Sequence, residues 1–218
     1  MLRESGLLLV AAAVVASSCE KRPPEPSPPP TTTVVVDKPT ATPQTASTDA
    51  SRPTVTSTEA APNRCMKALP DEPPTVPPPA ASCPPDPVFG GVRLPRGKVG
   101  FLQAADGISI DVELATTPEQ QERGLMFRTR MPENEGMLFA FDRSSVHHFW
   151  MHNTCIPLDL MFVAEDGFIT GIVESAPTLN DSSRSIPCPV AYVLEVNAGF
   201  SRRHGVKPGQ MIKLPPRS

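Results

Sequence analysis

The chain has 218 residues, a formal net charge of −3 and 29 prolines, and only 5% of its residues are aromatic. This slight acidic excess is unlike the basic surplus of nucleic-acid-binding domains, so we expect no nucleic-acid partner. The length allows one compact domain of about 120 residues together with long segments outside it.

The first residues are typical of an export signal. Arg3 precedes an apolar run from Leu7 to Ala16, which is shorter than the roughly 20 residues that a membrane-spanning helix requires. A run of this length fits the hydrophobic part of a secretory signal. We therefore expect residues 1–18 to be a signal peptide.

The residues Ala16-Ser17-Ser18-Cys19 resemble the lipobox of bacterial lipoproteins, in which the signal is cut before the cysteine and its thiol carries lipid. Ordinary signal cleavage, with Cys19 as a bystander, is the alternative. We expect lipidation at Cys19, because the cysteine is at the expected place and no alternative Ala-x-Ala cleavage site follows it. Two or three acyl chains would make the anchoring stable. The expected location is the bacterial cell envelope, either the periplasmic face or the outer membrane, with the membrane as a partner through Cys19.

Residues 19–95 contain most of the prolines, many threonines and serines, and almost no aromatic residues. Proline runs cannot donate backbone hydrogen bonds and favour the extended polyproline conformation. Such a composition cannot bury enough apolar surface to offset the entropy lost on ordering. It predicts a disordered, semi-extended tether, and recognition of its proline segments by a partner is a less favoured alternative.

Residues 96–218 are expected to form the folded domain. Alternation of apolar and polar residues predicts a strand over 108–115, and Thr117-Pro118 predicts the start of a helix that runs to about Phe127. Further strands are predicted at 136–141 and 147–151, joined by a turn at 142–145, and at 191–196 and 210–214, with a short helix at 198–204. A hairpin is predicted around Asp166-Gly167. This order favours an α+β fold, with a small, curved, mostly antiparallel sheet or open barrel and two short helices.

Several segments of this domain carry particular residue combinations. They are RGLMFRTRMPENEGMLFAFDRSSVHHFWMHNTCIPLD (123–159), DGFITGI (166–172), AYVLEVNAG (191–199) and HGVKPGQMI (204–212). Together they resemble DUF192, a widespread family of small domains, over residues 98–214. The resemblance implies a small domain but no reaction, because no biochemical activity is established for that family.

Five cysteines are present, and four remain if Cys19 is lipidated. Disulfides are plausible in an exported protein, and four cysteines allow three pairings. We expect Cys155 to pair with Cys188, since both lie in the domain, and Cys65 to pair with Cys83 in the tether. A catalytic thiol at Cys155 is the alternative. No closely spaced cysteine pair predicts a zinc site, and we expect no metal or other cofactor.

The polar and aromatic residues of the family motifs are the candidates for a ligand site: Arg123, Arg128, Trp150, His152, Asn153, Thr154, Asp159 and Glu195. An arginine fork can bind an anionic ligand, or it can pair with a carboxylate. An Arg123–Asp159 ion pair, with Asn153 and Thr154 fixing a turn, is the structural interpretation. Glu195 points either away from its apolar neighbours or inward towards an arginine, and in the second case it is a candidate acid only if its pKa is shifted. Many relatives are expected to have lysine at the position of His152.

No nucleophile elbow, phosphate loop or HExxH motif is present, which favours a binding protein over an enzyme. The leading hypothesis is a binding or accessory module for a small anionic or envelope-derived ligand, or for a partner protein. One alternative is an envelope enzyme in which His152, Asp159 or Glu195 acts as acid or base. Another is a purely structural adaptor, which an exposed apolar patch would favour.

Overall fold

The computed structural model describes residues 64–88, 91–104 and 107–216. The expected signal peptide, the lipidation site Cys19 and the tether up to residue 63 lie outside the described residues. In the part of the chain that is described, no helix combines the length and apolar character needed to cross a bilayer.

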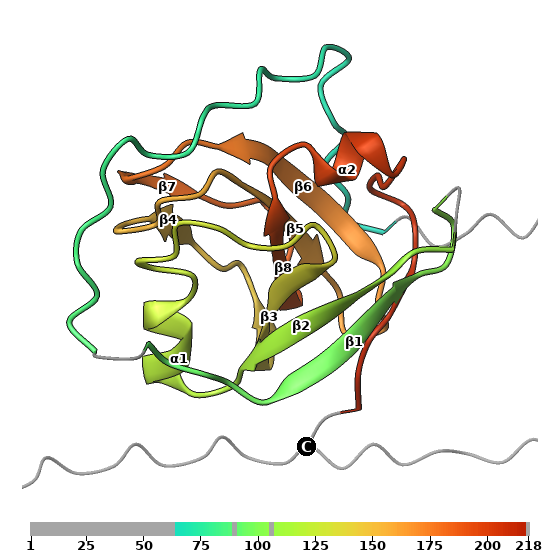
Figure 1. The fold of residues 1–218 in the computed structure, drawn as a ribbon. Helices are drawn as coiled ribbons and strands as arrows, with labels where there is room; N and C mark the ends of the chain where they lie inside the picture. The colour runs from blue at the N-terminus through green and yellow to red at the C-terminus, as the bar shows by residue number, and fades with distance from the viewer. Residues whose placement is uncertain (1–63, 89–90, 105–106, 217–218) are drawn as a thin grey trace, which may run out of the picture. The chain divides into compact units, whose positions relative to one another are not determined.

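A seven-stranded sheet with the order β6-β5-β8-β3-β2-β1-β9 dominates the domain (Figure 1). Its strands are β1 (Arg96–Phe101), β2 (Ser109–Ala115), β3 (Glu135–Ser145), β5 (Leu158–Val163), β6 (Ile169–Ala176), β8 (Val190–Asn197) and β9 (Ile212–Lys213). β2 and β3 are parallel, whereas the other neighbours are antiparallel. β4 (Phe149–Met151) and β7 (Asn180–Arg184) form a second, two-stranded sheet.

Two short helices, α1 (Pro118–Arg123) and α2 (Phe200–Arg203), accompany the curled sheet. The α+β fold expected from the sequence, with a curved and mostly antiparallel sheet, is therefore confirmed. The expected hairpin is present as β5 and β6, with Asp166-Gly167 in its turn. Two local predictions are wrong. β3 extends through residues 142–145, where a turn was expected, and α1 ends at Arg123 rather than near Phe127.

The end of α1 has a simple physical cause. Gly124 follows the helix with φ +48°, a conformation that residues with a Cβ rarely adopt, so the helix stops there. A Cβ at this position would also lie 3.2 Å from the ring of Phe139. The glycine therefore both ends the helix and lets it approach β3 closely.

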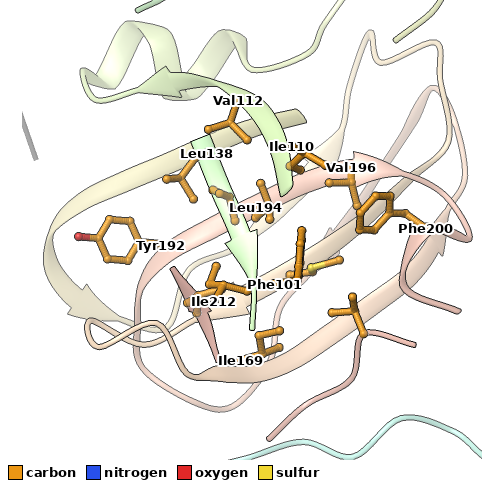
Figure 2. Close-up of a cluster of buried hydrophobic side chains, with 14 of the residues drawn as sticks. Phe101, Ile110, Val112, Leu138, Ile169, Tyr192, Leu194, Val196, Phe200 and Ile212 are labelled. Carbon is orange, nitrogen blue, oxygen red and sulfur yellow. The ribbon is translucent and has the colours of Figure 1, made fainter. Parts of the chain in front are cut away.

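The two faces of the sheet carry separate hydrophobic clusters. Side chains alternate along β5, so that Met161 and Val163 belong to the first cluster while Leu160 and Phe162 belong to the second. The first cluster, which includes Ile110, Leu194 and Phe200, fills the space enclosed by the curled sheet and α2 (Figure 2). The second lies on the other face, towards α1 and the β4–β7 sheet.

Residues 64–88, which we call the strap, run along the outside of the domain from near α2 to near α1 (Figure 1). A guanidinium N–H of Arg202 in α2 donates to the carbonyl of Pro70 over 2.9 Å, and Asp86 pairs with Arg123 of α1. Backbone hydrogen bonds join Lys67 to Thr170 and Ala80 to Cys155. This part of the expected tether thus has defined contacts with the domain.

The disulfide pairing expected from the sequence is wrong. Cys65 is bonded to Cys188, and Cys83 is bonded to Cys155. Each strap cysteine thus pairs with a domain cysteine, because the extended strap passes beside both of them. The prediction was wrong because it treated the strap and the domain as independent units, with one disulfide in each. Since Cys155 is disulfide-bonded, the alternative of a catalytic thiol at this position is also wrong.

Candidate functional site

A pocket of about 240 Å³ opens on the face of the sheet that carries the second cluster. Residues 121–126 form one wall, Phe139 and Phe141 of β3 form another, and residues 147–150 with Thr154 complete the lining. Glu195 of β8 contributes the only buried carboxyl among the described lining residues. We call this cavity the Glu195 pocket.

Glu195 lies in the middle of the sheet, directly opposite Met137 of β3 and Leu160 of β5. Only 4% of the residue is exposed. Within the described part of the chain, no hydrogen-bond donor or basic group contacts its carboxyl. Burial without a compensating partner disfavours the charged form and raises the pKa of Glu195 to about 8.

Aromatic rings line the pocket around this carboxyl. The rings of Phe139 and Phe149 meet edge to face, with centroids 5.0 Å apart, and Phe141 stacks on the imidazole of His147 at 3.6 Å. Trp150 is 50% exposed and lines the same pocket. The site therefore combines one buried acid with several aromatic rings.

Side-chain hydrogen bonds define the start of α1 and attach the helix to β3. Thr117 and Gln120 form a reciprocal capping box at its start. The side-chain amide of Gln121 then donates to the carbonyl of Ala140 in β3 over 2.8 Å. The helix wall is thus joined directly to the strand that supplies Phe139 and Phe141.

The expected ion pair between Arg123 and Asp159 is absent. Arg123 instead donates to Asp86 of the strap, with Nη2 and Oδ2 2.5 Å apart, and its guanidinium lies over the ring of Phe127. Arg128 binds Glu113 through two hydrogen bonds of 2.6 and 2.8 Å. Both arginine forks are therefore already used by carboxylates of the same chain.

Asp159 is fully buried on the opposite face of the sheet from Glu195. Its carboxylate accepts hydrogen bonds from the backbone N–H groups of Ser175, Gly199 and Ser201, at 2.9–3.1 Å. These contacts connect β5 to β6 and to the start of α2. Its role is to hold these segments together, and it lies too far around the sheet to act with Glu195 on one ligand.

The motif that follows β4 divides between the pocket and the surface. Thr154 lines the pocket, and its hydroxyl donates to the carbonyl of His152 over 3.2 Å. Asn153 adopts φ +50°, and its carbonyl accepts the N–H of Phe127. His152 contacts Asp181 over 2.8 Å, and both side chains are largely exposed. Asn153 and Thr154 thus fix a turn, while His152 lies outside the pocket.

The structure thus brings together four of the eight candidates, Arg123, Trp150, Thr154 and Glu195. The other four, Arg128, His152, Asn153 and Asp159, do not line this pocket. The remaining polar and aromatic lining residues were not predicted from the sequence as site residues: Gln121, Phe139, Phe141, His147, His148 and Phe149. The alternation in the segments from Gly136 to Phe141 and from His147 to Met151 was the available signal for them.

His147 and His148 both line the pocket, but they have different partners. His147 contacts the hydroxyl of Ser145 at 3.1 Å, and burial lowers its pKa. His148 contacts the hydroxyl of Ser183 in β7 at 3.0 Å. Over the described residues, no group of three or more histidine, cysteine or acidic side chains has an arrangement that could hold a metal ion.

Comparison with protein families gives a match to DUF192, described as "Uncharacterized ACR", over residues 101–214. The chain belongs to this family. The match includes every residue that lines the Glu195 pocket. No protein with a curated function matches the chain.

Two solved structures are similar to this domain. One is from Sinorhizobium meliloti 1021 and is provisionally described as a transcription regulator. It is 41% identical in sequence, and the alignment covers 57% of this chain and 97% of the Sinorhizobium chain, with a TM-score of 0.54. The other is a protein of unknown function from Novosphingobium aromaticivorans DSM 12444. It is 35% identical in sequence, and the alignment covers 62% of this chain and 94% of the Novosphingobium chain, also with a TM-score of 0.54.

Proposed function

We propose that the protein is a binding module of the bacterial cell envelope, whose DUF192 domain takes a small ligand into the Glu195 pocket. The observation that carries this proposal is a buried carboxyl that has no hydrogen-bond partner among the described residues, next to an open space lined by aromatic rings. Buried polar groups in folded proteins almost always have hydrogen-bond partners. A ligand that supplies the partner would compensate for the cost of burying this group.

The size of the pocket is consistent with this use. Engineered cavities of about 150 Å³ bind benzene, so a space of about 240 Å³ accommodates a molecule somewhat larger than one aromatic ring. Ligand pockets usually combine apolar walls with a few fixed polar groups, and here Glu195, Gln121 and Thr154 are those groups. The pocket is too small for a folded partner to enter.

A ligand screen by thermal shift tests the proposal. The purified chain, with its disulfides oxidised, is melted against envelope metabolites, amines and cell-wall fragments. A ligand at about 100 times its Kd should stabilise the domain by about 2.7 kcal/mol, and Glu195→Gln should abolish the shift. Glu165→Gln is the matched control, because it removes an exposed acid that does not line the pocket. Ligands that shift wild type and Glu195→Gln equally would contradict binding in this pocket.

Anchoring at the envelope is the second part of the proposal, and the lipobox-like sequence that ends at Cys19 supports it. Lipid on Cys19 would carry the domain on the membrane surface. Fractionation of cells that express the chain should recover it with membranes, and Cys19→Ser should move it to the soluble fraction. Recovery of both forms in the soluble fraction would contradict the anchor.

An acid–base enzyme is the second candidate function, and the raised pKa of Glu195 favours it. Of the three acid–base residues considered from the sequence, only Glu195 lines the pocket. General acid–base catalysis usually needs a second group in reach of the same substrate, and His147 and His148 are the available ones. Turnover of a screened ligand that is lost in both Glu195→Gln and His147→Gln would favour the enzyme over the binding module.

The description of the Sinorhizobium relative as a transcription regulator is not part of the proposal. This chain has a formal net charge of −3, and the arginines next to its pocket are paired with Asp86 and Glu113. A DNA-binding surface requires free basic groups to neutralise phosphates.

A further inference from the structure

We propose that the ligand of the Glu195 pocket is a small organic ammonium cation, with the Glu195 carboxylate as its counterion and the aromatic rings as its walls. This inference rests on the proposed function and adds the charge and chemical class of the ligand. It differs from the anionic ligand that the arginines of the sequence motifs suggest.

The charges around the pocket favour a cation. Among the described lining residues, Arg123 is the only permanent cation, and Asp86 already neutralises it. On the same side of the sheet, Arg128 is paired with Glu113 in a two-hydrogen-bond contact. An anion in the pocket would find no free positive group and would face Glu195. A cation would supply the positive partner that the ionised carboxylate of Glu195 lacks among the described residues.

The aromatic walls favour the same class of ligand. The face of an aromatic ring attracts a cation within about 6 Å, and cages of such rings bind quaternary ammonium groups. Phe139, Phe141, Phe149 and Trp150 all line the pocket. Because Trp150 is half exposed, it can contact a ligand at the mouth of the pocket while the carboxyl contacts the cation inside.

Proton release should accompany the binding of a cation. The pKa of free Glu195 is raised to about 8 by burial, so the carboxyl is protonated at neutral pH. A bound cation favours the charged form, and the proton must leave as the ion pair forms. The apparent affinity should therefore rise with pH until about pH 8, and then level off.

Other titratable groups face the pocket and must be separated from Glu195. They are Glu122 and Arg123 of α1, and His147 and His148 before β4. The Glu113–Arg128 pair, from β2 and the loop after α1, is on the same side of the sheet but does not line the pocket. From β3 and β5, the direct neighbours of Glu195 are the apolar residues Met137 and Leu160. A protonated His147 would also repel a cation at low pH, so the Glu195 variant must keep this residue.

Three probes of nearly equal shape and different charge test the inference. They are choline, its uncharged analogue 3,3-dimethylbutan-1-ol, and the anion 3,3-dimethylbutanoate. Binding to the full chain is measured by isothermal titration calorimetry at pH 6, 7 and 9, in two buffers of different ionisation enthalpy. Choline should bind, and the two analogues should bind at least about tenfold more weakly.

The pH series should give a specific pattern for choline. Relative to pH 9, binding should be about tenfold weaker at pH 7 and about a hundredfold weaker at pH 6, with close to one proton released at pH 6. Glu195→Gln should abolish choline binding at pH 9, and any residual binding should lose the pH dependence of the wild type. Glu165→Gln should keep the wild-type profile, because it removes an exposed acid of the same charge outside the pocket.

Two results would overturn the inference. Tighter binding of the alcohol or the anion than of choline would show that protonated Glu195 donates a hydrogen bond to an oxygen, and the binding module would remain. A failure of choline to bind at pH 9, at millimolar concentration, would reject the ammonium ligand by itself. The broader thermal-shift screen then decides whether the pocket binds any ligand.

Discussion

Two buried carboxyls on neighbouring strands of one sheet have opposite surroundings. Asp159 of β5 accepts three backbone N–H groups on the face of the first cluster. Glu195 of β8 lies on the other face without a hydrogen-bond partner among the described residues, and it borders an open pocket. The sheet therefore uses one acid to join its own segments and leaves the other available to a molecule from outside.

Hydrogen-bond partners distinguish the structural acid from the candidate functional acid. Both residues are almost inaccessible, so burial alone does not distinguish them. Their partners do, because a carboxylate with three donors is already compensated and one without donors is not. Substitution should therefore destabilise the fold at Asp159 and stabilise it at Glu195.

The largest effect is expected for Asp159→Ala. Three N–H groups would lose their acceptor, at about 1–3 kcal/mol for each one that remains buried, and we expect the free energy of unfolding to fall by about 3–5 kcal/mol. Urea denaturation measures the change. Asp181→Ala is the control, since its carboxylate is largely exposed, and it should cost less than about 0.5 kcal/mol. Equal small losses at both sites would contradict the structural role of Asp159.

The next effect concerns the strap, whose disulfides attach beside the second cluster. The double variant Cys83→Ser/Cys155→Ser should lose about 2–4 kcal/mol, because this bond closes a long loop. The loss of local stability should be larger on the sheet face that carries the second cluster than on the face that carries the first. Hydrogen exchange should become faster in β4 and β7 and remain slow in β1 and β2. Uniform acceleration would show that the strap supports both faces equally.

Glu195→Gln should stabilise the domain, and the gain should depend on pH. The folded-state pKa of about 8 lies above the unfolded value near 4.5, so the stability of the wild type is full below pH 4.5 and falls as pH rises to about 8. The slope in this window approaches about 1.4 kcal/mol per pH unit. The variant lacks this titration, and at pH 7 it should be more stable by about 1–3 kcal/mol. Parallel stability curves for the two proteins between pH 5 and 8 would contradict the raised pKa.

The smallest effect on stability is expected for Trp150→Ala. Half of this residue is exposed, so the domain should lose less than about 1 kcal/mol. Binding of choline should weaken by about 0.5–2 kcal/mol, the range of a cation–π contact. Calorimetry and thermal melting on one sample separate the two effects. A large drop in melting temperature with unchanged binding would place Trp150 in the core instead of the site.

The sequence was sufficient for much of the fold because the signals were local. The Asp166-Gly167 turn between two apolar runs predicted β5 and β6, and Thr117-Pro118 predicted the start of α1. The extension of β3 through residues 142–145 was missed, because a polar run at the end of a strand resembles a turn. The strap was missed for a related reason: its contacts are made by two disulfides and by single hydrogen bonds rather than by a hydrophobic pattern.

The site was harder to predict because its key property is an absence of partners. Sequence reasoning selected Glu195 and made its role depend on a shifted pKa, which the buried position now supplies. It assigned Arg123 to Asp159, since it could not see that Asp86 of the strap lies next to the helix. Opposite faces of one sheet also separate Asp159 from Glu195, although both belong to motifs of the same family.

The strap also determines where mechanical load enters the domain. A pull on the N-terminal side of the chain would reach the fold first at Arg64 and Cys65, where an ion pair with Asp166 and the bond to Cys188 hold it. The force would then pass through a covalent bond next to the start of β8, and it would not pull β1 away from β2. Under oxidising conditions the strands should therefore resist such a pull, whereas reduction would move the load past residue 88 to β1.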